Sequence, residues 1–364
     1  MNRKLTLFLA TLGILAMAVA GCASTAAPEP AETPAPESED SAKPVEQEAK
    51  TTTWTWVHMH PTTSEEYKSF ERIANAVMAM TDGLEIELHP GNTVVPEQDE
   101  LEAVHNGVVD AACNYHQYNQ KFYKASSLFS SAVGGLTSTQ ALYWFENEGD
   151  ELCAEMTSDL NVVYIGTEYI DVPEIWCHSK VPLESLSDLQ GLKMRAIGEA
   201  AEILGNVGVA TVHMAGAEVY EAAQRGVVDA FEWGSAQLNW RNNIQEVADY
   251  LYLSPSRAPR TGNGWWINRD SWDDVSPQIQ QACIAASKTE SLTLANRIGA
   301  EAGYLQNFRD YGTIVQPLPE EIETAFLEAA EEYYAEQSAA DPFFAKVYGS
   351  IMAWKATCQN MNVS

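Results

Sequence analysis

Apolar and polar residues alternate from Trp54 to Met59, the first regular pattern beyond the N-terminal region, and this alternation predicts a β-strand. From Ser64 the apolar positions recur with the 3.6-residue period of a helix, which is expected to stop at Asp82-Gly83. Alternation returns over residues 84–88 and predicts a second strand. Because strand, helix and strand in this order form the unit of a parallel sheet, the pattern predicts an α/β fold.

A ten-residue pattern occurs twice in the chain, at residues 102–111 and 221–230. Each copy predicts a helix that ends at a glycine, Gly107 or Gly226, suited to a left-handed cap, with a buried Val-Val strand after it. The segments that follow are aromatic and polar, as expected where parallel strands end in a ligand crevice. One copy in each of two lobes would set two crevice walls facing each other. The alternative is a coincidence between two common helix-glycine-strand units.

The N-terminal region predicts export. Arg3 and Lys4 precede an apolar run over residues 5–19 that is shorter than the roughly 20 residues of a membrane span, so residues 1–21 are expected to be a cleaved signal peptide. The Val-Ala-Gly-Cys sequence ending at Cys22 resembles the bacterial lipoprotein cleavage box, which implies a lipid on Cys22 that anchors the protein to the membrane. The alternative is an ordinary signal peptide with a cysteine near its cleavage site.

Composition adds a tether and a charge constraint. Residues 22–50 are rich in proline and acidic residues, and such a segment cannot bury enough apolar surface to fold, so a disordered tether is expected. The remaining chain is long enough for two domains or lobes. A formal net charge of −30 argues against nucleic acid as a partner, and a bound anion would need a few buried cations. The later cysteines show no metal-binding spacing and are expected to be mostly buried free thiols: Cys113, Cys153, Cys177, Cys283 and Cys358.

Two motifs, at residues 189–198 and 218–229, resemble the solute-binding proteins of TRAP transporters, the DctP family. The resemblance covers nearly all of the chain after the tether, including a late long helix within about 276–310. It implies a two-lobed, periplasmic-binding-protein-like α/β fold, in which each lobe is a mostly parallel sheet flanked by helices. Crossing strands, a long helix that spans both lobes and closure on the ligand like a hinged clamp are implied as well. The oligomeric state is open, with a monomer as the default.

The resemblance also implies domain boundaries and a function. Lobe I would comprise residues 51–172 and about 262–296, and lobe II residues 173–261 and about 297–364 with the C-terminal helices. The implied protein is extracytoplasmic, binds a small organic acid through its carboxylate, delivers it to the membrane subunits of a TRAP permease, and is not an enzyme.

Arg195 matches the family arginine that makes a two-point salt bridge with the substrate carboxylate. The local sequence is compatible with that role, because a strand is predicted over residues 192–197, Gly198 allows close approach, and a helix beginning near Glu199 directs N–H groups to the same place. A planar guanidinium matches a planar carboxylate. Without the resemblance, a strand arginine is more often part of a surface ion pair.

Glu232 and Trp233 match a subgroup of the family in which the glutamate helps to hold a metal ion and the tryptophan packs on an oxo or hydroxy acid. The resemblance therefore implies Na⁺ or Ca²⁺ bound with the substrate at Glu232. The later acidic ligand of that subgroup is absent from residues 259–267, which counts against the metal, since a hard cation needs several oxygen ligands. Arg257 or Arg260 could supply a second positive charge instead, and the alternative for each is a solvated loop arginine.

The remaining predicted ligand contacts are aromatic or histidine side chains near the ends of predicted strands. Half of the aromatic residues are as readily explained as core, and each histidine as a hydrogen-bonded structural residue. The candidates are His60, Tyr115, His116 and Trp176, together with Arg260 and the residues already named; Tyr118, Trp266 and His58 are further aromatic and histidine side chains expected at the cleft.

Two rival functions remain open at this level. An extracellular hydrolase should show a catalytic motif, and G-x-S-x-G, H-E-x-x-H and C-x-x-C are all absent. A binding lipoprotein that serves an ABC importer or a sensor shares the same sequence features, and the neighbouring genes distinguish it from a TRAP protein.

Overall fold

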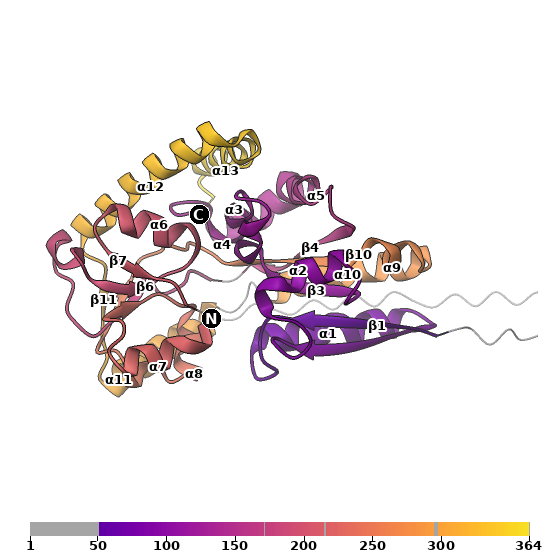
Figure 1. Cartoon of the computed structure of the whole chain (residues 1–364), viewed down its shortest axis with the longest axis horizontal. Coiled ribbons are helices and arrows are strands. Elements are labelled where there is room, and N and C mark those ends of the chain that lie inside the picture. The colour runs from indigo at the N-terminus through magenta and orange to yellow at the C-terminus, as the bar shows by residue number, and fades with distance from the viewer. Residues whose placement is uncertain (1–50, 171, 215, 295–297, 364) are drawn as a thin grey trace, which may run out of the picture. The chain divides into compact units, whose positions relative to one another are not determined.

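The computed structural model describes residues 51–170, 172–214, 216–294 and 298–363 (Figure 1). Contacts divide the chain into two units, Met1–Glu48 and Ala49–Ser364, and the described residues belong to the second. The predicted signal peptide, tether and lipid site at Cys22 lie outside the described residues. Within the described part no helix is both long and apolar enough to span a membrane.

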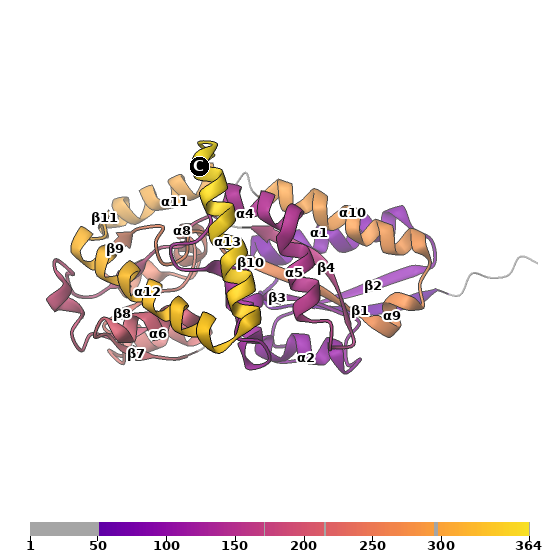
Figure 2. The ribbon, with the colours of Figure 1, turned by 90° about the horizontal axis from the view of Figure 1, so that it is seen from above.

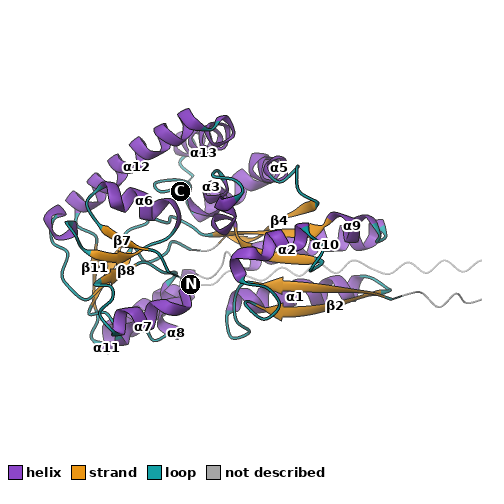
Figure 3. Ribbon diagram, in the orientation of Figure 1, coloured by secondary structure: helices purple, strands orange, loops and turns teal. Residues whose placement is uncertain are grey.

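The described chain is a mixed α/β protein with two sheets, as the sequence predicted (Figure 3). In the first sheet, ordered β2-β1-β3-β10-β4, strand β1 pairs in parallel with β2 and β3, whereas β10 is antiparallel to β3 and β4. Its strands are β1 (Thr52–His58), β2 (Leu84–Pro90), β3 (Ala111–Tyr115), β4 (Val162–Ile170) and β10 (Gly262–Asn268).

The second sheet has the order β11-β9-β5-β8-β6-β7. Strand β6 pairs in parallel with β7 and β8, β11 pairs in parallel with β9, and β5 is antiparallel to its two neighbours. Its strands are β5 (Cys177–Ser179), β6 (Lys193–Arg195), β7 (Ala210–Val212), β8 (Ala230–Phe231), β9 (Tyr250–Leu253) and β11 (Ile314–Pro317). The chain passes between the sheets after β4 and again before β10. Crossing strands were predicted, but the described parts of these connections, residues 172–176 and 254–261, are irregular.

The helices cover both sheets. Those that precede β4 or follow β10 directly are α1 (Glu65–Met80), α2 (Glu100–His105), α3 (Ser126–Ser131), α4 (Ser138–Trp144), α5 (Asp150–Met156), α9 (Arg269–Asp273) and α10 (Pro277–Leu294). The others are α6 (Gly198–Asn206), α7 (Val219–Gln224), α8 (Ala236–Arg241), α11 (Ile298–Tyr311), α12 (Glu320–Ala340) and α13 (Pro342–Asn360). Short helical turns are η1 (Glu97–Asp99), η2 (His116–Lys121), η3 (Phe145–Gly149), η4 (Leu186–Leu189), η5 (Gly216–Glu218) and η6 (Ile244–Glu246).

Helix α1 begins where the sequence predicts. The hydroxyl of Ser64 accepts a hydrogen bond from Tyr67 N at 3.0 Å, a cap worth about 1 kcal/mol. The apolar stripe that follows includes Phe70 and Val77, which pack against Trp56 and its neighbours in the first sheet. This amphipathic pattern fixes which side of the sheet α1 covers.

The repeated motif takes the same form in both sheets. Gly107 and Gly226 have φ of 69° and 71°, the left-handed geometry that was predicted, and the copies lead into β3 of one sheet and β8 of the other. The prediction of a buried Val-Val strand was only partly right. Val109 and Val228 are buried, but Val108 and Val227 are 62% and 50% exposed, and the strands begin only at Ala111 and Ala230.

The late long helix appears as two described helices. Helix α10 packs on α1 and β4 of the first sheet, while α11 packs on α8 and β11 of the second (Figure 2). Residues 295–297 between them lie outside the described part. Both halves of the predicted segment are helical, and a single helix that spans both lobes stays a prediction.

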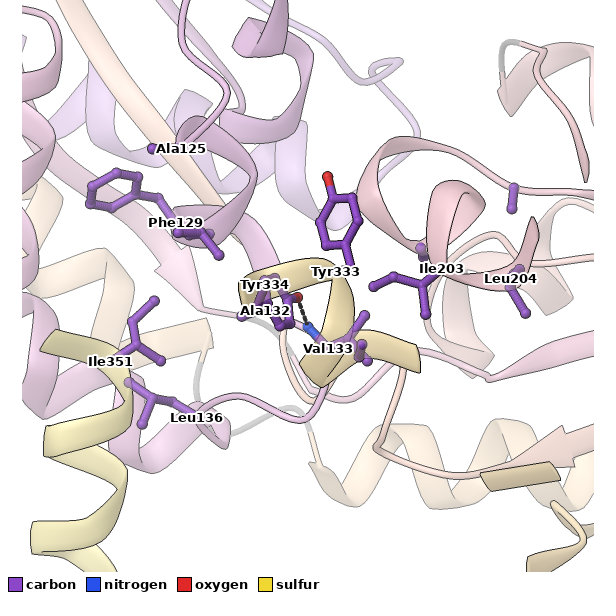
Figure 4. Packing of buried hydrophobic residues seen from close by; sticks show 14 of the residues in the cluster. Ala125, Phe129, Ala132, Val133, Leu136, Ile203, Leu204, Tyr333, Tyr334 and Ile351 are labelled. Carbon is purple, nitrogen blue, oxygen red and sulfur yellow. Dashed lines mark hydrogen bonds between the residues drawn. The ribbon is translucent and has the colours of Figure 1, made fainter. Parts of the chain in front are cut away.

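The C-terminal helices also connect both parts. Helix α12 packs on α6 beside the second sheet, and α13 packs on α4 beside the first (Figure 1). Figure 4 shows Tyr334 of α12 beside Val133, whose N–H donates to the tyrosine hydroxyl at 2.6 Å. Around this contact lie Phe129, Ile203 and Ile351 of one buried apolar cluster. The five described cysteines are buried free thiols, as predicted.

Candidate functional site

A cavity of about 300 Å³ lies where the parallel strands of both sheets end. Residues that follow β1, β2 and β3 line one wall, and residues that follow β6, β7 and β8 line the other, which is where ligands bind in open α/β sheets. The connections between the sheets add Glu174, Arg257, Ala258 and Thr261.

Arg195 ends β6 and lines this cavity, with only 2% of its surface exposed. Its Nε and Nη2 donate to Met214 O at 3.2 and 3.1 Å, and its Nη1 donates to the backbone and side-chain oxygens of Glu232 at 2.8 and 3.0 Å. Nη2 carries two hydrogens and makes this single bond within the described residues, so one N–H remains for a ligand. The arginine is thus buried, held by three acceptor oxygens of two residues, and placed at the cavity.

Glu232, directly after β8, lies between two guanidinium groups. Its Oε1 accepts from Arg195 and also from Ile197 N at 2.9 Å, while its Oε2 accepts from Arg257 Nη1 at 3.0 Å. Both arginines and the carboxylate are almost completely buried. In a low-dielectric site such pairs are strong only if their hydrogen bonds are complete, and here each carboxylate oxygen has a charged donor.

Arg257 is fixed from several directions in the second connection between the sheets. Its Nε donates to Trp176 O at 3.0 Å, and its Nη2 donates to Ile175 O at 2.8 Å and to Glu174 Oε2 at 2.7 Å. Burial lowers the pKa of the guanidinium, but the charges of Glu232 and Glu174 outweigh burial and the net shift is upward. Arg257 therefore stays charged at every physiological pH.

Other acidic groups line the same cavity. Burial raises the pKa of Glu97, whereas the charge of Arg195 acts in the opposite direction. Burial raises the pKa of Glu174 as well, and Arg257 opposes that shift. Burial also raises the pKa of Glu199 to about 7. The site is therefore not a simple positive patch, and an anion there depends on the placement of individual hydrogen bonds.

Several predicted contacts do lie at the cavity. His60, Tyr115 and Trp233 line it with Arg195 and Glu232, and Tyr118 contributes as well. The ring of His60 lies 3.2 Å from the Tyr115 hydroxyl. The indole of Trp233 packs closely against Gly216, where any side chain would clash, because a Cβ on residue 216 would lie 2.6 Å from the indole nitrogen.

Three predicted ligand contacts are corrected by the structure. His116 is buried among Phe129, Trp266 and other rings, and burial lowers its pKa to about 3, so it is a neutral core residue. Trp176 packs edge-on against Phe326, and only its backbone oxygen reaches the site, through Arg257. Neither side chain lines the cavity.

Arg260 is the third correction. Its guanidinium lies inside the first lobe and donates to the backbone oxygens of Leu128, Phe129 and Ser130 at 3.2, 2.7 and 2.6 Å. These are orphan carbonyls in the last turns of α3, which a cation satisfies well. Burial lowers the pKa of Arg260 to about 9. It stabilises a helix end and does not line the cavity.

A buried cluster behind the first wall could be mistaken for a metal site. Ligand atoms of His58, Cys113 and Glu168 lie within 4.8 Å of one another. However, His58 Nδ1 accepts a hydrogen bond from His60 N at 3.1 Å, so the neutral ring carries its hydrogen on Nε2 and donates to Glu168. With Asn263 and the Cys113 thiol also donating to Glu168, the cluster is a hydrogen-bond network that holds the backbone beside His60.

Sequence reasoning missed the acidic part of the site. Glu97 comes from the short η1 turn and Glu174 from an irregular connection, and neither position carries a periodic pattern or motif. Arg257 was considered, but its sequence neighbours do not distinguish it from Arg260. Their different environments arise from contacts with Trp176 and Glu174 in one case and with α3 in the other.

Comparison with known proteins shows the family of this chain. Residues 56–341 match the family model DctP, described as bacterial extracellular solute-binding protein, family 7. The chain belongs to this family. The match covers most of the chain and confirms the resemblance seen in the sequence motifs.

Several similar proteins are described as binding organic acids. The monocarboxylate 2-oxoacid-binding periplasmic protein of Nostoc sp. strain PCC 7120 is 26% identical over 323 residues, which are 84% of this chain and 82% of that protein. A TRAP solute-binding protein of Pseudoalteromonas atlantica T6c with bound sodium and pyruvate has a TM-score of 0.81 at 22% identity, covering 86% of this chain and 96% of that one. One from Bordetella bronchiseptica RB50 with calcium and picolinate has a TM-score of 0.79 at 23% identity, covering 86% and 94%.

Sodium or calcium, the cofactors that the resemblance implied, are therefore present in similar structures. The donor set of this family-7 chain does not fit such an ion at Glu232. Calcium takes about six to eight oxygen ligands, but both oxygens of Glu232 already accept from guanidinium groups. An ion beside them would also face the positive charges of Arg195 and Arg257 at close range.

Proposed function

We propose that this family-7 protein captures a small organic acid outside the cytoplasmic membrane and delivers it to a TRAP-type permease without changing it chemically. The observation that carries the proposal is a cavity at the ends of the strands of two sheets, lined by two buried arginines. Arg195 Nη2 and Arg257 Nη1 each keep one N–H that no described residue accepts. A carboxylate is the anion that such planar donors recognise best.

The cavity volume supports a small ligand. About 300 Å³ lies at the lower end of the range for small-molecule sites, which suits an acid of the size of pyruvate or a single-ring acid. The aromatic rings of Tyr115 and Trp233 offer apolar surface for the rest of such a molecule.

The test is a thermal-shift screen of the purified full chain against 2-oxo acids, 2-hydroxy acids, aromatic acids and pyroglutamate, followed by calorimetry. A ligand that binds the native state raises the apparent stability by mass action. We expect at least one acid to bind with one site per chain and to be recovered unchanged after long incubation. Failure of every acid to bind would contradict this proposal. Formation of product in proportion to the amount of protein would contradict it as well and would favour a hydrolase.

The partner is tested separately from the ligand. A TRAP receptor should support uptake in membrane vesicles that contain the two permease subunits and no ATP, whereas a receptor for an ABC importer requires an ATPase. Uptake that depends strictly on ATP hydrolysis would assign the protein to the other transporter class.

We also propose that Cys22 carries the lipid that keeps the protein at the membrane. The basic head, apolar run and small residues before Cys22 support this proposal. Intact-mass measurement of membrane-extracted protein should give a lipidated chain that starts at Cys22, and Cys22→Ser should release the protein or block its processing. A chain that starts elsewhere would contradict the proposal.

A further inference from the structure

We propose that the guanidinium of Arg257 takes the place of the metal ion that similar receptors hold, so that this protein binds its acid without sodium or calcium. The inference rests on the proposed function and concerns how the same site balances charge. Arg257 lies between two carboxylates, with Nη1 on Glu232 Oε2 at 3.0 Å and Nη2 on Glu174 Oε2 at 2.7 Å. A cation between two carboxylates is the arrangement that a bound metal ion would create.

All four oxygens of these carboxylates are already in use. Glu232 Oε1 accepts from Arg195 and from Ile197 N, and the remaining oxygen of Glu174 accepts from Thr261 Oγ1 at 2.6 Å. A hard cation would have to compete with a donor at each oxygen it gained, and at three of the four oxygens that donor is a guanidinium. The carboxylates are thus committed to side chains of the protein.

The backbone fixes Arg257 in this place. Ile175 O and Trp176 O accept from its Nη2 and Nε, so the guanidinium is oriented by atoms that no side-chain rotation can remove. An arginine held in this way delivers one positive charge at a constant position, whereas a dissolved ion must first be captured. Because one N–H of Nη1 is left over, the same group can also donate to the acid.

The charge balance supports the same conclusion. Arg195 and Arg257 face Glu232 and Glu174, so this buried network is neutral when all four groups are ionised. Removal of Arg257 would leave two buried carboxylates with one guanidinium, a combination that attracts a cation. The inference therefore predicts that the loss of Arg257 creates a calcium requirement that the natural protein lacks.

The first arm of the test needs no organic acid. The metal-stripped full chain is dialysed against calcium on the order of 0.1 mM, where a real calcium site of sensor affinity would fill. Wild type and Arg257→Lys should retain no calcium beyond background, whereas Arg257→Gln should gain about one ion per chain. Arg72→Gln is the matched control, because it breaks an arginine–glutamate pair with Glu290 outside the cavity. Calcium bound to the wild type at one per chain would overturn the inference.

The second arm uses calorimetry with pyruvate and with each acid found in the screen, in choline buffer with chelator and then with sodium or calcium restored. Wild-type affinity should change by less than about threefold, and Arg257→Gln should lose at least about tenfold without metal and regain part of it with calcium. Wild-type binding that appears only after metal is added contradicts the inference but not the proposed function. If no acid binds and the wild type also takes no calcium, the proposed function fails and the metal-free network stands.

Circular dichroism shows whether Arg257→Gln folds. If this variant does not fold, the measurements on wild type and on Arg257→Lys still decide the inference.

Discussion

At the scale of single residues, the site is built from buried charges whose hydrogen bonds are nearly complete. Arg195, Glu232 and Arg257 form a continuous chain of ion pairs with lengths of 3.0 Å. Removal of one member of such a chain leaves a buried charge without its partner, which costs more than the pair itself contributes. Their substitution should therefore affect the ligand and the remaining network together.

Arg195→Ala is expected to weaken binding of the acid by about 30-fold to several thousand-fold, equivalent to roughly 2–5 kcal/mol. The carboxylate of the acid would lose its charged donor, and Glu232 would lose one of its two charged donors. Arg195→Lys should recover only part of the affinity, since a single ammonium lacks the several directed donors with which a guanidinium can hold Met214 O and also bind a carboxylate. Calorimetry on folded variants measures the effect. An affinity of Arg195→Ala within about threefold of wild type would transfer the anchoring role to Arg257.

Arg260 should behave in the opposite way. Because its guanidinium satisfies three backbone oxygens of α3 and lies over the Phe145 ring, Arg260→Met should lower the unfolding free energy by about 3–5 kcal/mol. Acid affinity of the folded fraction should stay within about twofold, because the side chain does not line the cavity. Urea denaturation and calorimetry separate the two effects. A stable variant that had lost its ligand would restore Arg260 to the site.

At the scale of secondary-structure elements, the sequence predicted those features that repeat along the chain. The alternation before His58, the helix after Ser64 and the two left-handed glycines are local patterns, and all appear in the structure. Strands of two or three residues, such as β6 and β8, show no period of their own. The resemblance located β6, whereas the motif copy predicted a strand at Val227 and Val228, just before β8 begins.

The misassigned candidates show why the rest of the site could not be predicted. His116 and Trp176 follow or precede strands as ligand contacts often do, but the packing of Phe129 and of Phe326 from α12 decides that they are core. These contacts join residues far apart in sequence. Spacing along the chain therefore gives the position of a side chain on its element, but not what covers it.

A buried contact at the start of α6 makes stability depend on pH. Glu199 accepts from Ser127 Oγ at 2.8 Å and from Val133 N at 3.3 Å and is bonded to Tyr334 on α12. Burial raises its pKa from 4.5 to about 7, so the folded protein binds a proton that the unfolded chain releases between these values. With respect to this group, the unfolding free energy should therefore be highest at and below pH 4.5 and fall by up to about 3 kcal/mol as pH rises from 4.5 through 7.

Glu199→Gln should remove this contribution, since an amide does not ionise. The stability of the variant relative to wild type should improve by up to about 3 kcal/mol between pH 5 and pH 8, as measured by urea denaturation. Glu202→Gln on the same helix is the matched control, because that carboxylate is half exposed and pairs with Lys124. Parallel pH profiles for wild type and Glu199→Gln would show that Glu199 stays ionised in the folded protein.

At the scale of the whole described unit, the two walls of the cavity belong to two different sheets. Residues after β1 and β3 lie on one wall and residues after β6 and β8 on the other, while two connections and the C-terminal helices link the sheets. A ligand that contacts both walls stabilises whichever arrangement brings them together, by as much as its affinity differs between open and closed forms. The neutral Arg–Glu network lies on the second wall and on the connections between the sheets, whereas His60 and Tyr115 lie on the first wall. A bound acid that contacts this network and these two side chains would therefore link the two walls.

Saturation with an acid from the screen should therefore make the protein more compact. The radius of gyration from small-angle X-ray scattering should decrease on addition of the acid, and it should not change for Arg195→Ala at the same concentration. Tryptophan fluorescence should change as well, mainly through Trp233, because it is the tryptophan among the described residues that lines the cavity. Trp233→Phe should remove most of the fluorescence change and leave the decrease in radius. A radius of gyration that stays constant while calorimetry shows full occupancy would mean that the acid enters a cavity that is already closed. A ligand with equal affinity for two conformations does not shift the equilibrium between them.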